Sequence, residues 1–344
     1  LLATHDVNFA NPQTCLDINT VMGQGSCSTF GEDIQYQIPA GAIPAGMTFH
    51  LPNGQTVAGG TNSPALDIVG LRPYSSPLCN YVNASTCPPD GVPVFSEIYA
   101  QDTIANSNYN SLQTSLEKRF AKGLQFQAAY TFSKSIDQAS SFENILVPNN
   151  FRRTRSLSLF DARHRFVLSY YCEFPIPKFS GAKGKLLNGW AMSGITTYQS
   201  GFPIRITSFS DNELLGDTFD FEFPSEPNQV LPFRHLDPRK NNGFYFDPNT
   251  FSDAAVPLGM LGNAPRTICC GPGIQDWTVA FHKTTAVTEG THVEFRAELF
   301  NAFNHTQFLN PCGNSSNCSD GSQLGQVTQA RNPRLIQLAL KYIF

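Results

Sequence analysis

The sequence contains little charge and no long apolar run. Only 15% of its 344 residues are charged, and the formal net charge is −4. This balance lacks the basic surface that nucleic-acid binding requires, so we expect no nucleic-acid partner. No apolar run approaches the roughly 18–20 residues of a membrane-spanning helix. Two classes remain: a soluble protein, or a membrane protein whose strands need only about 9–11 residues each.

Catalytic and cofactor-binding motifs are also absent from the sequence. It contains no nucleophile elbow, phosphate-binding loop, dinucleotide fingerprint or zinc-protease motif. We therefore expect no enzyme activity, no catalytic residue, no cofactor and no metal. His164, which follows Asp161 and lies between Arg163 and Arg165, is a conceivable catalytic or metal-binding residue. We interpret it as part of a loop-to-strand boundary.

Cysteine is present in nine copies, and most of them occur in close pairs. Cys269 and Cys270 are adjacent, whereas Cys172 stands alone in a strand-like run. Pairs that flank short loops indicate an oxidising compartment and predict disulfides. A zinc site remains an alternative, although no pair has the usual two-residue spacing. The residues that we expect to form disulfides are Cys15, Cys27, Cys79, Cys87, Cys312 and Cys318.

Apolar and polar residues alternate strictly in several segments, which predicts β-strands. The clearest segment is 123–133, where Leu124, Phe126 and Tyr130 share one face with Ala128 and Phe132. The preceding segment, 109–120, pairs with it in a predicted hairpin whose turn is 121–123. Five further strands are predicted at 165–174, 190 to about 206, around 277–281, 292 to about 303, and 334–344. An eighth is predicted from Val94 to about Ala100.

These segments divide the chain into two predicted regions. Residues 1–92 lack clean periodicity, so we expect an irregular region of loops and short strands there. Residues 93–344 are predicted to form antiparallel strands, and helix signals are nearly absent. Short connections near 121–123 and 288–290 alternate with long ones at 137–156 and 207–272. In outer-membrane barrels the short turns face the periplasm and the long loops face outward.

Alternation alone fits a β-sandwich as well as a transmembrane barrel. Three features favour the barrel: Gln, Thr and charged residues on the polar faces, aromatic residues near strand ends, and strands longer than the usual five or six residues. On the strand 292–303 we expect Glu294, Arg296 and Glu298 to face the barrel lumen. The predicted fold is therefore all-β: a partial antiparallel transmembrane barrel, about eight or more C-terminal strands of a larger one, with long extracellular loops.

The last strand resembles the terminal signature by which the barrel-assembly machinery recognises outer-membrane proteins. Its apolar residues alternate and its last residue is aromatic. The residues that carry this resemblance are Leu338, Leu340, Tyr342 and Phe344.

Most of residues 92–344 resembles the C-terminal barrel of Oar-like TonB-dependent transporters, which are common in Acidobacteria and carry a carboxypeptidase-regulatory-like domain. The resemblance implies a plugged barrel of about 22 strands that is driven by the TonB complex. Because only about eight strands are predicted, we interpret the chain as a C-terminal portion that does not transport alone. The segments that carry the resemblance are 107–113, 123–137, 160–166, 189–203, 295–308 and 325–344.

The leading hypothesis is thus a wall segment of a TonB-dependent receptor in the bacterial outer membrane. Its expected partners are outer-membrane lipid, the barrel-assembly machinery, an unidentified ligand, and the TonB complex through an N-terminal part outside this sequence. The alternatives are a non-transporting barrel that acts in adhesion or surface structure through its long loops, and a soluble secreted β-sandwich. The acidic residues of the longest loop, which we interpret as solvated rather than cation-binding, are Asp211, Glu213, Asp217, Asp220 and Glu222.

Overall fold

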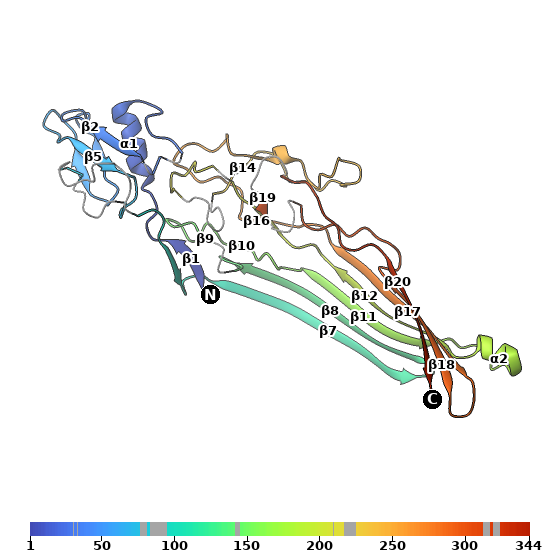
Figure 1. Cartoon of the computed structure of the whole chain (residues 1–344). Coiled ribbons are helices and arrows are strands. Elements are labelled where there is room, and N and C mark those ends of the chain that lie inside the picture. The colour runs from blue at the N-terminus through green and yellow to red at the C-terminus, as the bar shows by residue number, and fades with distance from the viewer. Residues whose placement is uncertain are drawn as a thin grey trace.

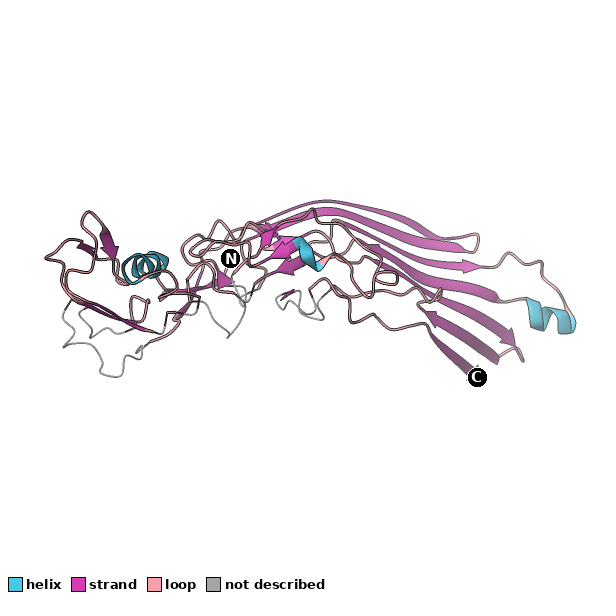
Figure 2. Ribbon diagram, turned by 90° about the horizontal axis from the view of Figure 1, so that it is seen from above, coloured by secondary structure: helices cyan, strands magenta, loops and turns pink. Residues whose placement is uncertain are grey.

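The computed structural model shows an elongated molecule with a large antiparallel sheet at one end and a small subdomain at the other (Figures 1 and 2). It describes residues 1–29, 31–32, 34–75, 81–82, 95–141, 145–208, 210–216, 225–311, 317–318 and 324–344. Several small sheets and long connections lie between the two ends. Among the described residues, no helix has the length and apolar character needed to cross a membrane.

The large sheet has eight strands, and each strand pairs antiparallel with its neighbours. The seven longer strands follow in chain order from β7 to β20, while the two-residue β10 pairs with the end of β8. The strands are β7 (Ser107–Ala121), β8 (Leu124–Asp137), β10 (Ser156–Leu157), β11 (His164–Glu173), β12 (Trp190–Gln199), β17 (Ile274–Ala286), β18 (His292–Phe300) and β20 (Leu335–Ile343).

The register of this sheet gathers the apolar side chains of the seven long strands on one surface, which we call the apolar face. Residues directly opposite each other in antiparallel strands point to the same side. One row of partners from β8 to β20 is Phe126, Tyr170, Gly194, Val279, Leu299 and Ile336. The next row is Leu124, Cys172, Met192, Phe281, Ala297 and Leu338. The seven long strands are at the predicted places, and the alternation predicted for β8, β11, β17, β18 and β20 is confirmed.

Two of the predicted strands are wrong in part. The eighth strand does not join the large sheet: β6 (Tyr99–Asp102) pairs instead with β1 (Ala3–Asp6), which also pairs with β9 (Ile145–Leu146). The predicted run from Trp190 to about Ile206 divides into β12 and the separate β13 (Ile204–Ile206). Pro203 lies in the break and has no N–H to donate to a ladder, so the long strand ends before it.

Short and long connections lie at opposite ends of the large sheet, as predicted (Figure 1). The hairpin turn between β7 and β8 uses Lys122 and Gly123 at φ 53° and 78°, the left-handed backbone that tight hairpins require. The β17–β18 turn closes by a Val287 N–H bond to the Thr291 carbonyl of 2.9 Å. Helix α2 (Gly181–Leu187) and the C-terminus lie at this same end.

The long connections at the other end contain short two- or three-residue elements. The sheet β16–β13–β19 and the pair β14–β15 lie there. Their buried apolar core includes Ile204, Ile206, Phe246, Phe251 and Ile268. The elements are β14 (Asn228–Gln229), the 3-10 helix η2 (Pro248–Thr250), β15 (Phe251–Ser252), β16 (Thr267–Ile268) and β19 (Asn317–Cys318).

The N-terminal subdomain contains a helix that the sequence analysis did not predict. Helix α1 (Pro12–Met22) begins after Asn11, whose side chain accepts a hydrogen bond from the Gln13 N–H, and Pro12 fits the first turn. Its apolar periodicity is weak because it buries polar residues. Asp17 accepts bonds from His50, and Asn19 is bonded to the Cys27 backbone through both side-chain atoms. Tertiary contacts therefore stabilise a helix that its own pattern does not indicate.

Two short antiparallel pairs complete this subdomain. They are β2 (Gln35–Ile38) with β5 (Leu66–Val69), and β3 (Thr48–His50) with β4 (Thr56–Ala58). Ile18 of α1 is buried in a core with Phe49, Ile38 and Ile68. The described residues of this region form short strands and loops, as predicted for residues 1–92, together with the helix α1 that was not predicted.

The cysteines of the described residues form two disulfides. Cys15 in α1 is bonded to Cys27, with their Cα atoms 5.4 Å apart, and Cys269 is bonded to Cys270. Cys172 is a free cysteine on β11. Cys79, Cys87 and Cys312 lie outside the described residues, and only the backbone of Cys318 is described.

Removing the Cys15–Cys27 disulfide is expected to destabilise the N-terminal subdomain by about 2–4 kcal/mol, because the bond restricts the unfolded chain. We expect Cys15→Ser with Cys27→Ser to make residues 1–75 more susceptible to proteolysis, while β7 to β20 stay resistant. Cys172→Ser is the matched control and should leave the subdomain unchanged. Equal proteolysis rates for the double variant and the wild type would contradict the prediction.

Candidate functional site on the polar sheet face and the long connections

The surface of the large sheet opposite the apolar face, which we call the polar face, carries hydroxyl, amide and charged side chains. One row of partners across six strands is Gln125, Tyr171, Ser193, Ala280, Glu298 and Gln337. A neighbouring row is Glu173, Ala191, His282, Arg296 and Ala339. The polar side chains are thus continuous across the strands, as the lumen of a barrel requires.

The three charged residues predicted from the sequence share this polar face on β18. Arg296 Nη2 lies 2.6 Å from Glu298 Oε1. Glu294 Oε1 lies 3.9 Å from His282 Nδ1 on β17, and Glu294 pairs across the ladder with Lys341 on β20. Opposite charges at facing positions contribute about 0.2–1 kcal/mol each. The polar face of β18 therefore carries one close ion pair, Arg296 with Glu298, beside a carboxylate that faces a lysine on the next strand.

One group of polar-face side chains resembles the serine, histidine and carboxylate of a nucleophilic catalytic site. It consists of Ser193, His282 and Glu294. Ser193 Oγ lies 2.8 Å from His282 Nε2. However, the 3.9 Å between His282 and Glu294 exceeds a hydrogen bond. Ser193 also lies in the middle of β12, which pairs with β11 on one side and β17 on the other. Its backbone therefore belongs to a sheet ladder and forms no oxyanion hole.

Aromatic side chains cluster towards the two ends of the apolar face. Towards the long connections, Tyr198 packs edge-on against Trp277, which packs edge-on against Phe303, with ring centroids 6.0 and 5.4 Å apart. Towards the short turns lie Trp190 and the Tyr342–Phe344 pair, whose centroids are 6.2 Å apart. Aromatic bands near both ends are typical of a strand-built surface that crosses a bilayer, and Tyr170 and Phe281 lie between the two bands on this face.

His164 begins β11 within the first of these bands. Its Nδ1 lies 2.8 Å from the Tyr130 hydroxyl, and its ring packs against Phe132. Asp161 is buried and accepts a hydrogen bond from the Ser135 N–H. His164 is therefore part of a strand boundary, as interpreted from the sequence, although its partners are aromatic residues and not charged ones.

The C-terminal strand β20 presents its alternate residues on the apolar face. Leu340 is 74% exposed and Phe344 is 94% exposed. Leu338 and Tyr342 lie on the same face and are exposed to similar extents. A row of large apolar side chains on one edge strand is stable only where an apolar medium covers it.

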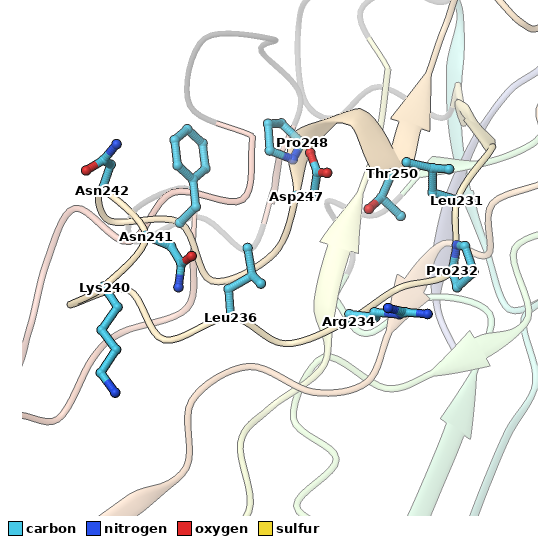
Figure 3. A pocket seen from close by; sticks show the side chains of 11 residues that line it. Leu231, Pro232, Arg234, Leu236, Lys240, Asn241, Asn242, Asp247, Pro248 and Thr250 are labelled. Atoms are coloured by element: carbon cyan, nitrogen blue, oxygen red, sulfur yellow. The ribbon is translucent and has the colours of Figure 1, made fainter.

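A pocket of about 680 Å³ lies in the long connection between β13 and β17. Its lining residues come from one stretch of chain (Figure 3) and mix apolar, amide and charged side chains, a combination that suits a small polar ligand. They are Leu231, Pro232, Arg234, Leu236, Lys240, Asn241, Asn242, Phe244, Asp247, Pro248 and Thr250.

The pocket stretch is held by backbone hydrogen bonds and by the core beneath it. The Leu236 N–H donates to the Tyr245 carbonyl at 2.6 Å, and the Tyr245 N–H donates to the Gly325 carbonyl at 2.8 Å. Phe246, next in sequence, is fully buried beside Phe251 and Phe233. The pocket therefore lies on an ordered part of the connection.

Two ion pairs hold this connection in place, one to the end of the large sheet and one to the connection between β9 and β10. Arg266 contacts Asp137 at the end of β8, and both side chains are almost completely buried. Arg153 Nη2 lies 2.9 Å from Glu226 Oε2. A buried charge that loses its partner costs about 3–5 kcal/mol, so the Arg266–Asp137 pair favours a single position of the connection.

The acidic residues predicted to be solvated are buried where the structure describes them. Asp211 accepts hydrogen bonds from the Leu215 and Gly216 N–H groups at 2.8 and 3.0 Å. Glu213 is also buried, and burial raises its pKa to about 8. The solvated interpretation is therefore wrong for these two residues. Asp217, Asp220 and Glu222 lie outside the described residues, and no metal-binding group of three or more ligands occurs among the residues that are described.

The family comparison agrees with this geometry. The sequence model for a family described as outer membrane beta barrel domain matches residues 7–337, nearly the whole chain. The chain belongs to this family. It is therefore an all-β protein of the bacterial outer membrane. In barrels of this class the apolar face of the wall is the lipid-facing one and the polar face lines the interior. The soluble sandwich considered from the sequence is excluded. Comparison with proteins of curated function gives no match.

Membership of the family also indicates which end of the barrel wall faces the periplasm and which end faces outward. Outer-membrane barrels have short periplasmic turns and long extracellular loops. The end with the C-terminus, the two tight turns and α2 is therefore periplasmic, and the long connections are outer loops. The pocket and the N-terminal subdomain lie on the outer side (Figure 1).

The outer loop is expected to loosen as the pH rises. Burial raises the pKa of Glu226 to about 7 and that of Glu213 to about 8, from 4.5. The folded loop thus favours the protonated acids, and this stabilisation is complete below pH 4.5 and lost as the pH rises to 7–8. We expect hydrogen exchange of residues 205–216, corrected for its intrinsic pH dependence, to be about tenfold faster at pH 8 than at pH 5.

The variant Glu213→Gln should keep most of the protection at pH 8, because it removes the buried ionisable group. Asp253→Asn, a change of the same kind elsewhere in the loop, serves as the control and should behave like the wild type. Identical exchange of the wild type at both pH values would contradict the role of these acids.

One buried group, not predicted from the sequence, joins the N-terminal subdomain to the outer loop. Arg72 is 1% exposed; its Nη1 lies 3.1 Å from Asp6 Oδ2, and its Nη2 lies 3.2 Å from Glu97 Oε1. Arg72 also donates to the Gly216 carbonyl. The sequence does contain a signal for this group, because Arg72 directly follows the apolar run 68–71. A charged side chain next to a buried strand is itself expected to be buried and therefore to need charged partners.

Proposed function

We propose that this chain forms the C-terminal wall and outer loops of an Oar-like TonB-dependent transporter. The carrying observation is the polar face, which continues across seven long strands and leads at its outer end to loops with a ligand-sized pocket. A polar interior is the property of barrels that conduct or hold a plug. The resemblance of residues 92–344 to the transporter barrels supports the same assignment.

Energy-coupled uptake belongs to the whole protein in this proposal. The chain supplies wall, recognition loops and assembly signal, while a plug and a TonB-binding segment are supplied elsewhere in the full-length protein. The proposed role is non-enzymatic. The barrel-assembly machinery and the TonB complex are its proposed protein partners, and a siderophore, glycan or peptide is the proposed class of cargo.

Uptake of the cargo is expected to require both the proton-motive force and the pocket. Cells that express the full-length gene should accumulate at least one labelled compound from a panel of ferric siderophores, oligosaccharides and oligopeptides. An uncoupler or deletion of the TonB gene should abolish that accumulation. Replacing residues 231–250 by a glycine-serine linker should reduce uptake about tenfold or more, the effect of losing about 1.4 kcal/mol of binding.

A control replacement on the periplasmic side keeps this test specific. Exchanging the Thr288-Glu289-Gly290 turn for Asn-Gly should leave both surface display and uptake intact. Energy-independent accumulation, or uptake that survives loss of the pocket, would contradict the proposal.

A second candidate is adhesion without transport, and one observation favours it. The N-terminal subdomain has its own buried core and lies beyond the outer loops, where it is well placed to contact another surface (Figure 1). Deleting residues 8–75 distinguishes the candidates: an adhesive barrel should lose cell binding, whereas a transporter should retain uptake of its cargo.

A further inference from the structure

The periplasmic connection between β11 and β12 is longer and more apolar than the other two periplasmic connections. It comprises residues 174–189 and includes α2, whereas the others are tight turns. Four of its apolar side chains are exposed: Ile176, Phe179, Leu186 and Leu187. Leu186 is 69% exposed, more than most apolar residues of the apolar face itself.

Hydrogen bonds hold the second half of this connection, residues 185–188, against the lipid-facing side of the barrel wall. The indole Nε1–H of Trp190 donates to the Leu186 carbonyl at 3.1 Å. Lys283 Nζ donates to the Asn188 carbonyl at 2.7 Å, and Thr285 Oγ1 donates to the Lys185 carbonyl at 3.4 Å.

All three of these donors belong to the apolar face. Trp190 pairs with Lys283, which lies two residues along β17 from Phe281 of the apolar row. Thr285, two residues further on, pairs with Val293, which pairs in turn with Tyr342. Side chains alternate along a strand, so Trp190, Lys283 and Thr285 point towards lipid. The helix therefore lies outside the barrel, on the membrane side, and not in the lumen.

All charged side chains of the connection are positive. Lys178, Lys183 and Lys185 lie in it, and no Asp or Glu occurs between Phe174 and Trp190. The Asn188 side chain bonds the backbone N–H and carbonyl of Phe179, at 3.2 and 2.9 Å, which joins the two ends of the connection. The lysines and the exposed apolar residues are thus held together in one compact element.

We propose that residues 174–189 form an interfacial anchor that lies in the periplasmic leaflet of the outer membrane and binds anionic phospholipid. Phe179, Leu186 and Leu187 enter the acyl region, and Lys183 and Lys185 contact phosphate headgroups. Ile176 and Lys178 instead line a pocket with Glu173 and His282 of the polar face and are not part of the lipid contact. A short element with apolar and basic residues at a membrane boundary has these properties. The phosphates are those of phospholipid, because the short-turn end of the wall is periplasmic.

Hydrogen exchange of the full-length protein in defined bilayers tests the proposal. Nanodiscs of phosphatidylcholine alone are compared with nanodiscs that contain phosphatidylcholine and phosphatidylglycerol in a three-to-one ratio, and with detergent micelles. We expect amides 181–188 to exchange about tenfold more slowly in the phosphatidylglycerol bilayer than in phosphatidylcholine.

Two variants separate the apolar and electrostatic contributions. Leu186→Asp with Leu187→Asp should remove the protection in both bilayers. Lys183→Gln with Lys185→Gln should remove only the difference between them. Leu258→Asp, a change at a leucine of similar exposure to Leu187 but in the outer loop, should leave amides 181–188 unaffected. A heat-modifiable band on gels verifies that each variant barrel is assembled.

Three results would overturn the anchor. Equal exchange in bilayers and micelles would place the connection in water. Equal protection with and without phosphatidylglycerol would remove the anionic lipid from the assignment. Protection that arises only after a periplasmic extract is added would make the occupant a protein. All three are compatible with the proposed transport function, so the two proposals fail separately.

Discussion

Deleting Phe344 reduces the assembled protein in the outer membrane by about tenfold or more, because the lost side chain is worth about 1.5–3 kcal/mol in an apolar environment. Phe344 is the most exposed of the large apolar residues that the structure describes, and it ends the row formed by Leu338, Leu340 and Tyr342. Recognition by the assembly machinery adds to this loss, since the same row carries the terminal signature. The measurement is the amount of heat-modifiable protein in purified outer membranes.

Two substitutions near the C-terminus serve as controls for this deletion. Phe344→Tyr keeps an aromatic last residue and should assemble normally. Ile343→Ala shortens the neighbouring side chain, which belongs to the opposite face, and should have little effect. Normal outer-membrane levels of the deletion variant would show that Phe344 has no role in assembly.

An arginine at Ala128 is expected to destabilise the barrel by about 2–4 kcal/mol, whereas an arginine at Ala129 is expected to change its stability by less than about 1 kcal/mol. The two alanines are adjacent in the middle of β8. Ala128 pairs with Leu116 and Leu168 on the apolar face, and Ala129 pairs with Ser115 and Val167 on the other side. The first arginine would be placed in lipid and the second in the barrel interior.

Because the two variants have the same composition and position along the strand, their difference reports only the face. Urea unfolding in bilayers, or the temperature at which heat-modifiability is lost, measures it. Equal destabilisation by both arginines would contradict the assignment of the two faces, and stronger destabilisation at Ala129 would reverse it.

The periodicity of the sequence was sufficient to locate the seven long strands and both faces of the barrel wall. Along β8 the residues alternate between apolar and polar, as Phe126 and Gln127 do. Over ten or more residues, such a period of two is explained only by a β-strand. Polarity also showed that Glu294, Arg296 and Glu298 share a face, because side chains on a strand alternate whatever its partners are.

Shorter elements could not be predicted in the same way. Helix α1 buries Asp17 and Asn19, so its pattern is polar on the side that a sequence analysis expects to be apolar. The strand β6 pairs with β1, which is about a hundred residues away in sequence, and no local signal distinguishes that pairing from membership of the large sheet. The buried acids Asp211 and Glu213 were misjudged because an acidic run in a loop is usually solvated.

The sequence by itself determined what the two faces of each long strand contact, since alternation along a strand is a local property. It also determined which end is periplasmic, because the turn lengths follow directly from the strand boundaries. The tertiary structure alone decided where the outer loop is attached, how Arg72 and Arg266 are neutralised, and that α2 lies on the lipid side of the wall. These features depend on partners that are distant in sequence. The role of a buried charge or of an exposed leucine can therefore be assigned only once the fold shows which residues lie beside it.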